Sequence, residues 1–260
     1  MPRIRAGLSV LLLALCCTGC DVASAATVPP PAPLLGPAAP VVLGGDTLTL
    51  LRSGPATFAE LLRLLHTARA SIEVEVYEFG QRPLADALVA AHRRGVEVTV
   101  IDDPSELSSV VTAARLRQAG VAVVDYPVRK LMIDHVKLLV VDSSVAVIGG
   151  INWGVASPAN HDYDAEITGP AVPNLERVFR RDLVTCGVMT SIPDPVPDPS
   201  VIVAATLPAA EIRPLALDVI NGALHTLRLE LFVLTDTGIV HALEAARQRG
   251  VDVLLLLDPS

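Results

Sequence analysis

The segment DHVKLLVVDSSVAVIGGINWG, residues 134–154, predicts two short apolar strands joined by a polar turn. Side chains two positions apart on a strand share a face, so His135 and Lys137 are expected to point the same way. The turn falls at Asp142, and the second strand is expected over residues 145–148. Three apolar side chains between the polar ones are expected to face the core: Val136, Leu138 and Val140.

The polar groups of this segment suit the chemistry of a phosphodiester. A neutral imidazole such as that of His135 can attack phosphorus. The Lys137 ammonium would neutralise a non-bridging oxygen, and the Asn152 amide would add a hydrogen bond where charge builds up. Gly149 and Gly150 would let the backbone come close to a ligand. This chemistry needs no metal, and the sequence offers no clear cluster of metal ligands, so no metal and no other cofactor is expected.

The pattern H-x-K-x4-D-x6-G-G-x-N, which starts at His135, resembles the HKD motif of the phospholipase D superfamily. The segment NHDYDAEITGP, residues 160–170, resembles the stretch that follows the motif in cardiolipin synthases and related bacterial proteins. The resemblance covers the chain from residue 47 to its end. It implies the phospholipase D fold, an α-β-α sandwich with a mixed sheet and two pseudo-symmetric halves.

The same resemblance implies a role for each matching residue. His135 would be the nucleophile or the general acid of a reaction that passes through a phosphohistidine, and Lys137 and Asn152 would hold the phosphate. Asp162 falls where the family has an acidic residue that binds the catalytic imidazole and fixes its tautomer. Three further motif positions are expected to be structural: Asp142, Gly149 and Gly150.

Strand and helix patterns alternate before the motif. Helical apolar spacing or helix-stop signals occur in three segments, and strand patterns in four. This alternation argues for an α/β fold with a largely parallel or mixed sheet. The expected helices cover residues 58–69, 84–94 and 107–118, and the expected strands cover 47–51, 72–77, 96–101 and 121–124.

Residues 201–260 repeat residues 46–105 without a gap at a constant offset of 155, with 14 identities in 60 positions. The triplet Asp-Pro-Ser at 103–105 recurs at 258–260. An internal repeat of this kind indicates a duplicated structural unit. The second copy stops before the counterpart of His135, so a second His-x-Lys is expected about 30 residues beyond Ser260.

The expected organisation follows from this repeat. A first phospholipase D-like half over residues 46–190 carries the motif, a proline-rich connector covers 191–200, and a truncated second half covers 201–260. Because one histidine cannot both attack and protonate the leaving group in one step, the isolated chain is expected to be nearly inactive. Pairing of two chains through one motif each is the alternative.

The N-terminus predicts export. Residues 1–25 combine a basic start with an apolar core, as a signal peptide does. Ala23-Ser24-Ala25 predicts cleavage and release from the membrane, whereas the small residues before Cys20 resemble a lipobox and would make Cys20 a lipidated first residue. Residues 26–45, rich in proline and alanine, are expected to be a linker. The protein would be a membrane-anchored lipoprotein or a secreted or periplasmic protein.

Composition narrows the substrate class. The net charge is −8, so the whole molecule has no long-range attraction for nucleic acid or for an anionic bilayer. The predicted function is phosphodiester hydrolysis or phosphatidyl transfer on a phospholipid at a membrane surface, with no nucleic acid partner. The alternatives are an exported nuclease of the same superfamily and a catalytically dead remnant that binds phosphate.

Overall fold

The computed structural model describes residues 36–129 and 133–259. The predicted signal segment, Cys20 and residues 26–35 lie outside the described residues. The chain divides into two compact units, whose described parts are residues 36–129 with 133–203, and residues 204–259.

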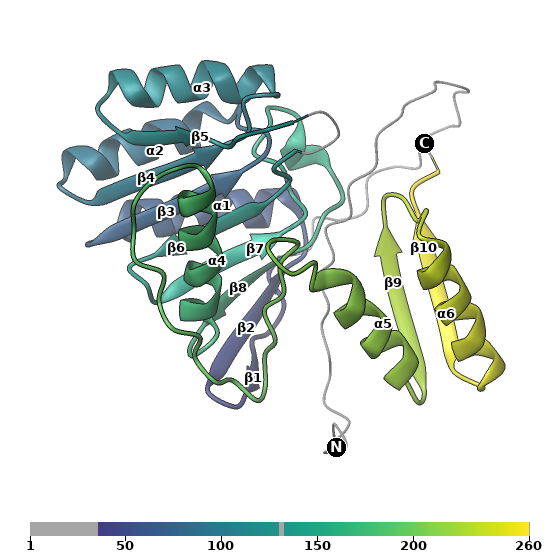
Figure 1. Cartoon of the computed structure of the whole chain (residues 1–260). Helices are drawn as coiled ribbons and strands as arrows, with labels where there is room; N and C mark the ends of the chain where they lie inside the picture. Colours follow the sequence, from purple (N-terminus) through teal and green to yellow (C-terminus); the bar gives the residue numbers. More distant parts are fainter. Residues whose placement is uncertain (1–35, 130–132, 260) are drawn as a thin grey trace. The chain divides into compact units, whose positions relative to one another are not determined.

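The first unit is built on one eight-stranded sheet in the order β1-β2-β8-β7-β6-β3-β4-β5 (Figure 1). Strands β3, β4 and β5 run parallel, and the other neighbours pair antiparallel, so the sheet is mixed. The strands are β1 Val41–Leu43, β2 Asp46–Leu51, β3 Ser71–Val76, β4 Glu97–Asp102, β5 Ala122–Asp125, β6 Lys137–Val141, β7 Val145–Gly149 and β8 Asp164–Thr168.

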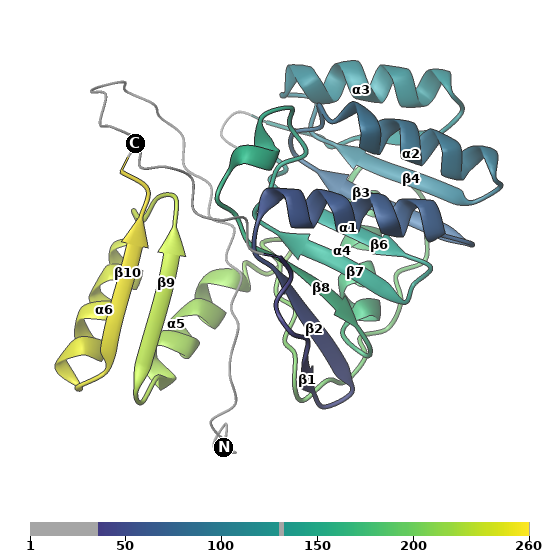
Figure 2. The ribbon, with the colours of Figure 1, turned by 180° about the vertical axis from the view of Figure 1, so that it is seen from behind.

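Helices cover both faces of this sheet. Helices α1 (Gly54–Thr67), α2 (Arg82–Arg93) and α3 (Leu107–Gln118) lie on one face, and α4 (Val172–Thr185) lies on the other (Figures 1 and 2). Helix α1 begins after Ser53, whose hydroxyl accepts a hydrogen bond from the Ala56 amide at 3.4 Å. The predicted α/β class with a mixed sheet between helical layers is confirmed, and the elements expected before the motif lie close to their expected bounds.

Burial of the motif strand differs from the expectation. All five residues of β6 are buried, not only alternate ones. Leu139 and Val141 pack in the core under α1 and α2. Leu138 and Val140 are buried on the opposite face, where α4 contacts β3 and β6. A strand with helices on both sides has no solvent face, so Lys137 is buried together with the core residues of its own face.

Two segments expected to be linkers contribute to the first unit. Within the predicted linker 26–45, β1 pairs antiparallel with β2, because the turn at Gly44 reverses the chain there. The predicted connector 191–200 has no helix or strand, but it lies along α4. Asn174 exchanges two hydrogen bonds of 2.9 Å with the backbone of Val196, and Arg177 donates to the Pro193 carbonyl at 2.8 Å.

The second unit holds α5 (Ile212–Gly222), β9 (Thr226–Leu231), α6 (Thr237–Gln248) and β10 (Asp252–Leu257). Strands β9 and β10 pair in parallel from Thr226 opposite Asp252, which is the β3–β4 pairing of Ser71 opposite Glu97 shifted by 155. Helix α6 has the bounds of α2 shifted by the same number. The internal repeat therefore extends from residue identities to strand register.

The turns of the two copies also agree. Gly95 and Gly250 end equivalent helices with φ values of 90° and 89°, a conformation that only glycine adopts without strain. Arg94 donates to the Leu65 carbonyl at 2.9 Å, and its counterpart Arg249 donates to the Ile220 carbonyl at 3.1 Å. Within residues 36–129 and 133–259, none of the helices combines the length and the apolar character that crossing a bilayer requires.

Candidate active site

His135 and Lys137 lie in direct contact at the start of the motif strand. Strand β6 begins at Lys137, so His135 lies just before it rather than on it. The Lys137 ammonium nonetheless lies 2.9 Å from His135 Nδ1 and 2.9 Å from the His135 carbonyl oxygen. The Tyr77 ring packs beside both groups, with its centroid 4.6 Å from the imidazole and 5.3 Å from Lys137 Nζ. The aromatic face adds a favourable contact for the buried ammonium.

The environment keeps the imidazole neutral. Burial lowers the pKa of His135, the Lys137 ammonium lowers it further, and the Asp103 carboxylate raises it, with a net value of about 4. An ammonium can only donate a hydrogen bond, so Nδ1 is the acceptor, and we infer that the neutral ring carries its proton on Nε2. A neutral imidazole is the form that can attack phosphorus.

The backbone around His135 is anchored on both sides. The amide of Asp134 donates to Asp103 Oδ2 at 2.7 Å, and the amide of Val136 donates to Asp134 Oδ1 at 3.2 Å. The Val136 carbonyl accepts from the Tyr77 amide at 3.1 Å. These bonds fix the position from which the imidazole projects.

Asn152 lies three residues beyond β7. Its side chain is half-buried, and its Oδ1 is buried without a hydrogen-bond partner among the described residues. Buried polar groups are normally paired. The amide of Asn152 is therefore a candidate for contact with a ligand.

Asp162 and Asp164 lie against the two motif glycines. A Cβ atom on Gly150 would stand 2.8 Å from Asp162 Oδ1, and one on Gly149 would overlap the Asp164 carboxylate. The glycines thus make room for protein carboxylates, which differs from the expected approach of a ligand to their backbone. The contact expected between Asp162 and the imidazole of His135 stays a prediction.

Asp142 joins the hairpin turn to the start of β3. Its carboxylate accepts hydrogen bonds from the amides of Arg69, Ala70 and Ser71 at 2.7–3.2 Å. Burial alone would raise the pKa of Asp142, but the three backbone hydrogen bonds outweigh it and lower the pKa. These contacts support a structural role for this motif residue.

Three residues of the site were not singled out from the sequence: Tyr77, Asp103 and Asp164. Asp164 is 1% exposed and accepts from Thr57 Oγ1 at 2.9 Å and from the Ile151 amide at 3.4 Å. Burial raises its pKa to about 6 against these hydrogen bonds. The repeated Asp-Pro-Ser triplet was a usable signal for Asp103, and the match of Tyr77 to an aromatic residue in the second copy was a weaker one.

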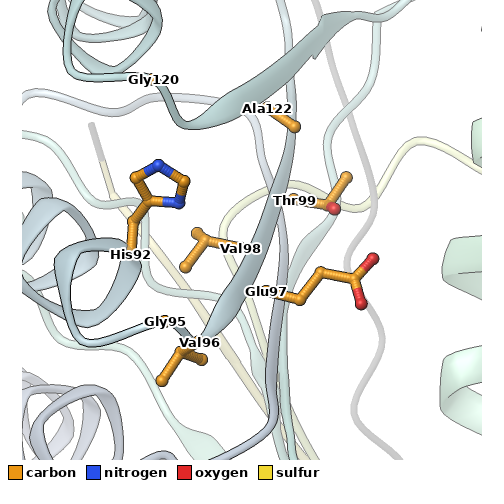
Figure 3. A pocket seen from close by; sticks show the side chains of 8 residues that line it. All are labelled: His92, Gly95, Val96, Glu97, Val98, Thr99, Gly120 and Ala122. Carbon is orange, nitrogen blue, oxygen red and sulfur yellow. The ribbon is translucent and has the colours of Figure 1, made fainter.

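A hollow of the described surface lies elsewhere. It measures about 350 Å³ and lies where β4 and β5 begin (Figure 3). Asp103 follows the other end of β4, the carboxyl end, where ligands bind in open α/β sheets. The hollow is therefore separate from the His135 site. Its lining residues are His92, Gly95, Val96, Glu97, Val98, Thr99, Gly120 and Ala122.

Comparison with known proteins agrees with the motif. The family model described as "cardiolipin synthase, PLD-like domain" matches residues 61–183, which include His135, Lys137 and Asn152. Mitochondrial cardiolipin hydrolase of Xenopus tropicalis is 36% identical over 118 residues, which are 45% of this chain and 55% of that protein. Cardiolipin synthase 1 of Bacillus cereus is 28% identical over 160 residues, 52% of this chain and 31% of that protein. The chain spans about half, or less, of the length of these relatives.

Solved structures show likeness of fold. The phospholipase D family member Nuc from Salmonella typhimurium matches with a TM-score of 0.49 at 19% identity, over 54% of this chain and 95% of that chain. Polyphosphate kinase from Porphyromonas gingivalis matches with a TM-score of 0.53 at 15% identity, over 82% of this chain and 37% of that chain. The family match over residues 61–183 and the relatives that share it confirm the resemblance carried by the motif. The chain carries a PLD-like domain of the phospholipase D superfamily over residues 61–183.

Proposed function

We propose that this protein hydrolyses or transfers the phosphodiester of a phospholipid through a phosphohistidine formed on His135. The observation that carries the proposal is the contact of 2.9 Å between Lys137 Nζ and His135 Nδ1, beside an imidazole that is neutral at physiological pH. The names of the relatives, cardiolipin hydrolase and cardiolipin synthase, favour a phospholipid substrate.

The resting contact suggests how the substrate would activate the histidine. A phosphate that draws the Lys137 ammonium onto a non-bridging oxygen would release Nδ1. The ring could then lose its Nε2 proton to water while Nδ1 takes up a proton from water, and attack phosphorus with the Nε2 lone pair. The N–P bond forms as the P–O bond to the leaving alcohol breaks. The Asn152 amide would support the charge on the phosphoryl oxygens.

The second step restores the enzyme. Water or an acceptor alcohol attacks phosphorus, the N–P bond breaks, and the product is the free or the transferred phosphatidyl group. The leaving alkoxide of the first step needs a proton that His135 cannot give while it attacks. General acid help of this kind is worth about 10²–10⁴-fold in rate, so we propose that a second histidine completes the site.

The nuclease alternative has less support. The net charge of −8 opposes binding of a polyanion. The experiment that separates the two uses the enzyme completed with the proposed second histidine and compares phosphatidylcholine, phosphatidylglycerol and a single-stranded nucleic acid as substrates in parallel, with a chelator present. Cleavage of the lipids that is lost in His135→Ala supports the proposal. Preference for the nucleic acid would overturn the substrate class, and full activity of His135→Ala would overturn the mechanism.

A further inference from the structure

The Asp-Pro-Ser triplet that occurs in both copies of the repeat forms a tight turn directly after β4. Asp103 is fully buried, and its Oδ1 accepts from the amide of Ser105 at 2.7 Å and from the Ser105 hydroxyl at 2.5 Å. A carboxylate bonded to the amide two residues ahead is an Asx turn, which closes the loop on itself. The turn therefore holds one oxygen of Asp103 and leaves the other to reach a different segment.

That second oxygen reaches the catalytic segment 31 residues away. Asp103 Oδ2 accepts the hydrogen bond of the Asp134 amide at 2.7 Å, and the bond is buried. Asp134 directly precedes His135, and the Tyr77 amide holds the Val136 carbonyl on the other side. A charged acceptor makes a stronger bond to an amide than a neutral one, so the Asp103 anchor is well suited to fix this backbone.

Asp103 also places a buried negative charge close to the imidazole. Hydrogen bonds from Ser105 and from the Asp134 amide compensate its charge. The groups that face His135 are the Lys137 ammonium, the Asp103 carboxylate and the Tyr77 ring, whose hydroxyl donates to Glu106 at 2.8 Å. Of these, Asp103 favours the protonated imidazole and Lys137 opposes it.

We propose that Asp103 is the positioning residue of His135, which holds the backbone at Asp134 and supplies a fixed negative charge to the imidazole. The proposal rests on the proposed function in one respect, because it takes His135 as the reacting group. It adds an acidic partner that the motif does not contain and that comes from a different strand. Asp103 acts through the backbone and through its charge and does not itself contact the substrate.

The test is an NMR titration of the His135 ring in the full chain, which does not depend on turnover. Asp103→Asn keeps the size of the side chain and removes the charge, so we expect His135 to titrate at a lower pH than in the unmodified chain. Asp102→Asn is the matched control. Asp102 is the neighbouring buried acid, and its carboxylate lies 3.8 Å from Arg117. We expect this control to leave the His135 titration unchanged.

A second variant moves the titration in the opposite direction and guards against misfolding. Ser105→Ala alters an exposed residue and removes one hydrogen bond that compensates the carboxylate. The less compensated charge favours the imidazolium, so His135 should titrate at a higher pH. A His135 titration that stays the same in both Asp103→Asn and Ser105→Ala, with the amide spectrum otherwise preserved, would overturn the proposal.

Hydrogen exchange tests the anchoring separately. In Asp103→Ala the Asp134 amide loses its charged acceptor and should exchange at least about ten-fold faster, given the usual strength of such a bond. The amide of Val140 in the middle of β6 should keep its exchange rate. In lipid hydrolysis by an enzyme completed with the second histidine, we expect Asp103→Asn to lower kcat more than it changes KM, since Lys137 and Asn152 remain to bind phosphate. Altered titration in an unmodified chain that forms no phosphoryl adduct on His135 with bis(p-nitrophenyl) phosphate would refute the proposed function and leave the role of Asp103 standing.

Discussion

The ammonium of Lys137 and the imidazole of His135 share a hydrogen bond of 2.9 Å on a buried face of the sheet. The contact places a positive charge against Nδ1 and thereby disfavours protonation of the ring. It also holds the ammonium and the imidazole against one another, and we expect a bound phosphate to separate them. We therefore regard this pair as the site without substrate. Binding of a phosphodiester would break the contact between Lys137 and His135.

Replacing Lys137 tests this coupling. In Lys137→Met the apolar stem stays and the charge is lost, so the pKa of His135 should rise from about 4 toward its ordinary value. Burial, the larger cause of the shift, should still keep the pKa of His135 below that value. Activity should nearly vanish, because the phosphate loses its cation. An NMR titration of the ring and a lipid assay measure the two effects, and an unchanged titration would contradict the coupling.

Buried acids give the stability of the fold a clear pH dependence. Burial raises the pKa of Glu73, Asp102 and Asp134 to about 7 in the folded chain, and that of Asp182 to about 6. Between pH 4 and 7 the folded state then binds more protons than the unfolded state. The stability contributed by these neutral acids is complete below about pH 4 and is lost as the pH rises through about 7. Thermal unfolding at pH 4.5, 6 and 7.5 should show a falling midpoint, and a midpoint that rises would contradict this assignment.

Glu75 should show the same effect in a single substitution. Glu75 is fully buried, and burial together with the neighbouring carboxyl groups of Asp134 and Asp182 holds its pKa well above the usual range. Glu75→Gln removes the titration and keeps the shape. At pH 8 it should stabilise the fold by roughly 1–3 kcal/mol relative to the unmodified chain, the usual size of a buried polar penalty, with a smaller gain at pH 4. Urea unfolding at the two pH values measures the difference, and equal effects would contradict the assignment.

Asp142 should matter for stability rather than for chemistry. Asp142→Ala removes the acceptor of three backbone amides and should cost about 1–2 kcal/mol, since the carboxylate is partly exposed. Ser143→Gly is the control in the same turn. Ser143 has a φ of 48°, where glycine fits without strain, so this change should be neutral or slightly stabilising. Urea unfolding tests both, and loss of catalysis in a fully folded Asp142→Ala would show a role beyond the turn.

The N-terminal segment predicts export, which labelling with a radioactive fatty acid would test. Label that disappears in Cys20→Ala supports a lipoprotein, and an unlabelled chain cleaved after Ala25 supports release. An unprocessed chain retained in the cytoplasm would contradict both routes.

The sequence revealed the hairpin but not its surroundings. The spacing of His135 and Lys137 and the turn at Asp142 follow from local rules, so their arrangement could be predicted. The burial of Lys137 could not, because it depends on helices packed on both faces of the sheet. The bond from Asp134 to Asp103 joins residues 31 apart, and the space that Gly149 leaves for Asp164 joins two different strands. Such contacts arise from tertiary packing, which strand and helix patterns do not encode.

The most direct measurement traps the covalent intermediate on His135. Bis(p-nitrophenyl) phosphate suits this purpose, since its leaving group departs as a stable anion and needs no general acid. Incubated with the full chain and a chelator, it should release p-nitrophenolate and leave an acid-labile phosphoryl adduct, which peptide mass spectrometry should locate on His135. His135→Ala should form no adduct, and His161→Ala should form it normally. No adduct on His135, or an adduct that survives His135→Ala or disappears with the chelator, would contradict the account.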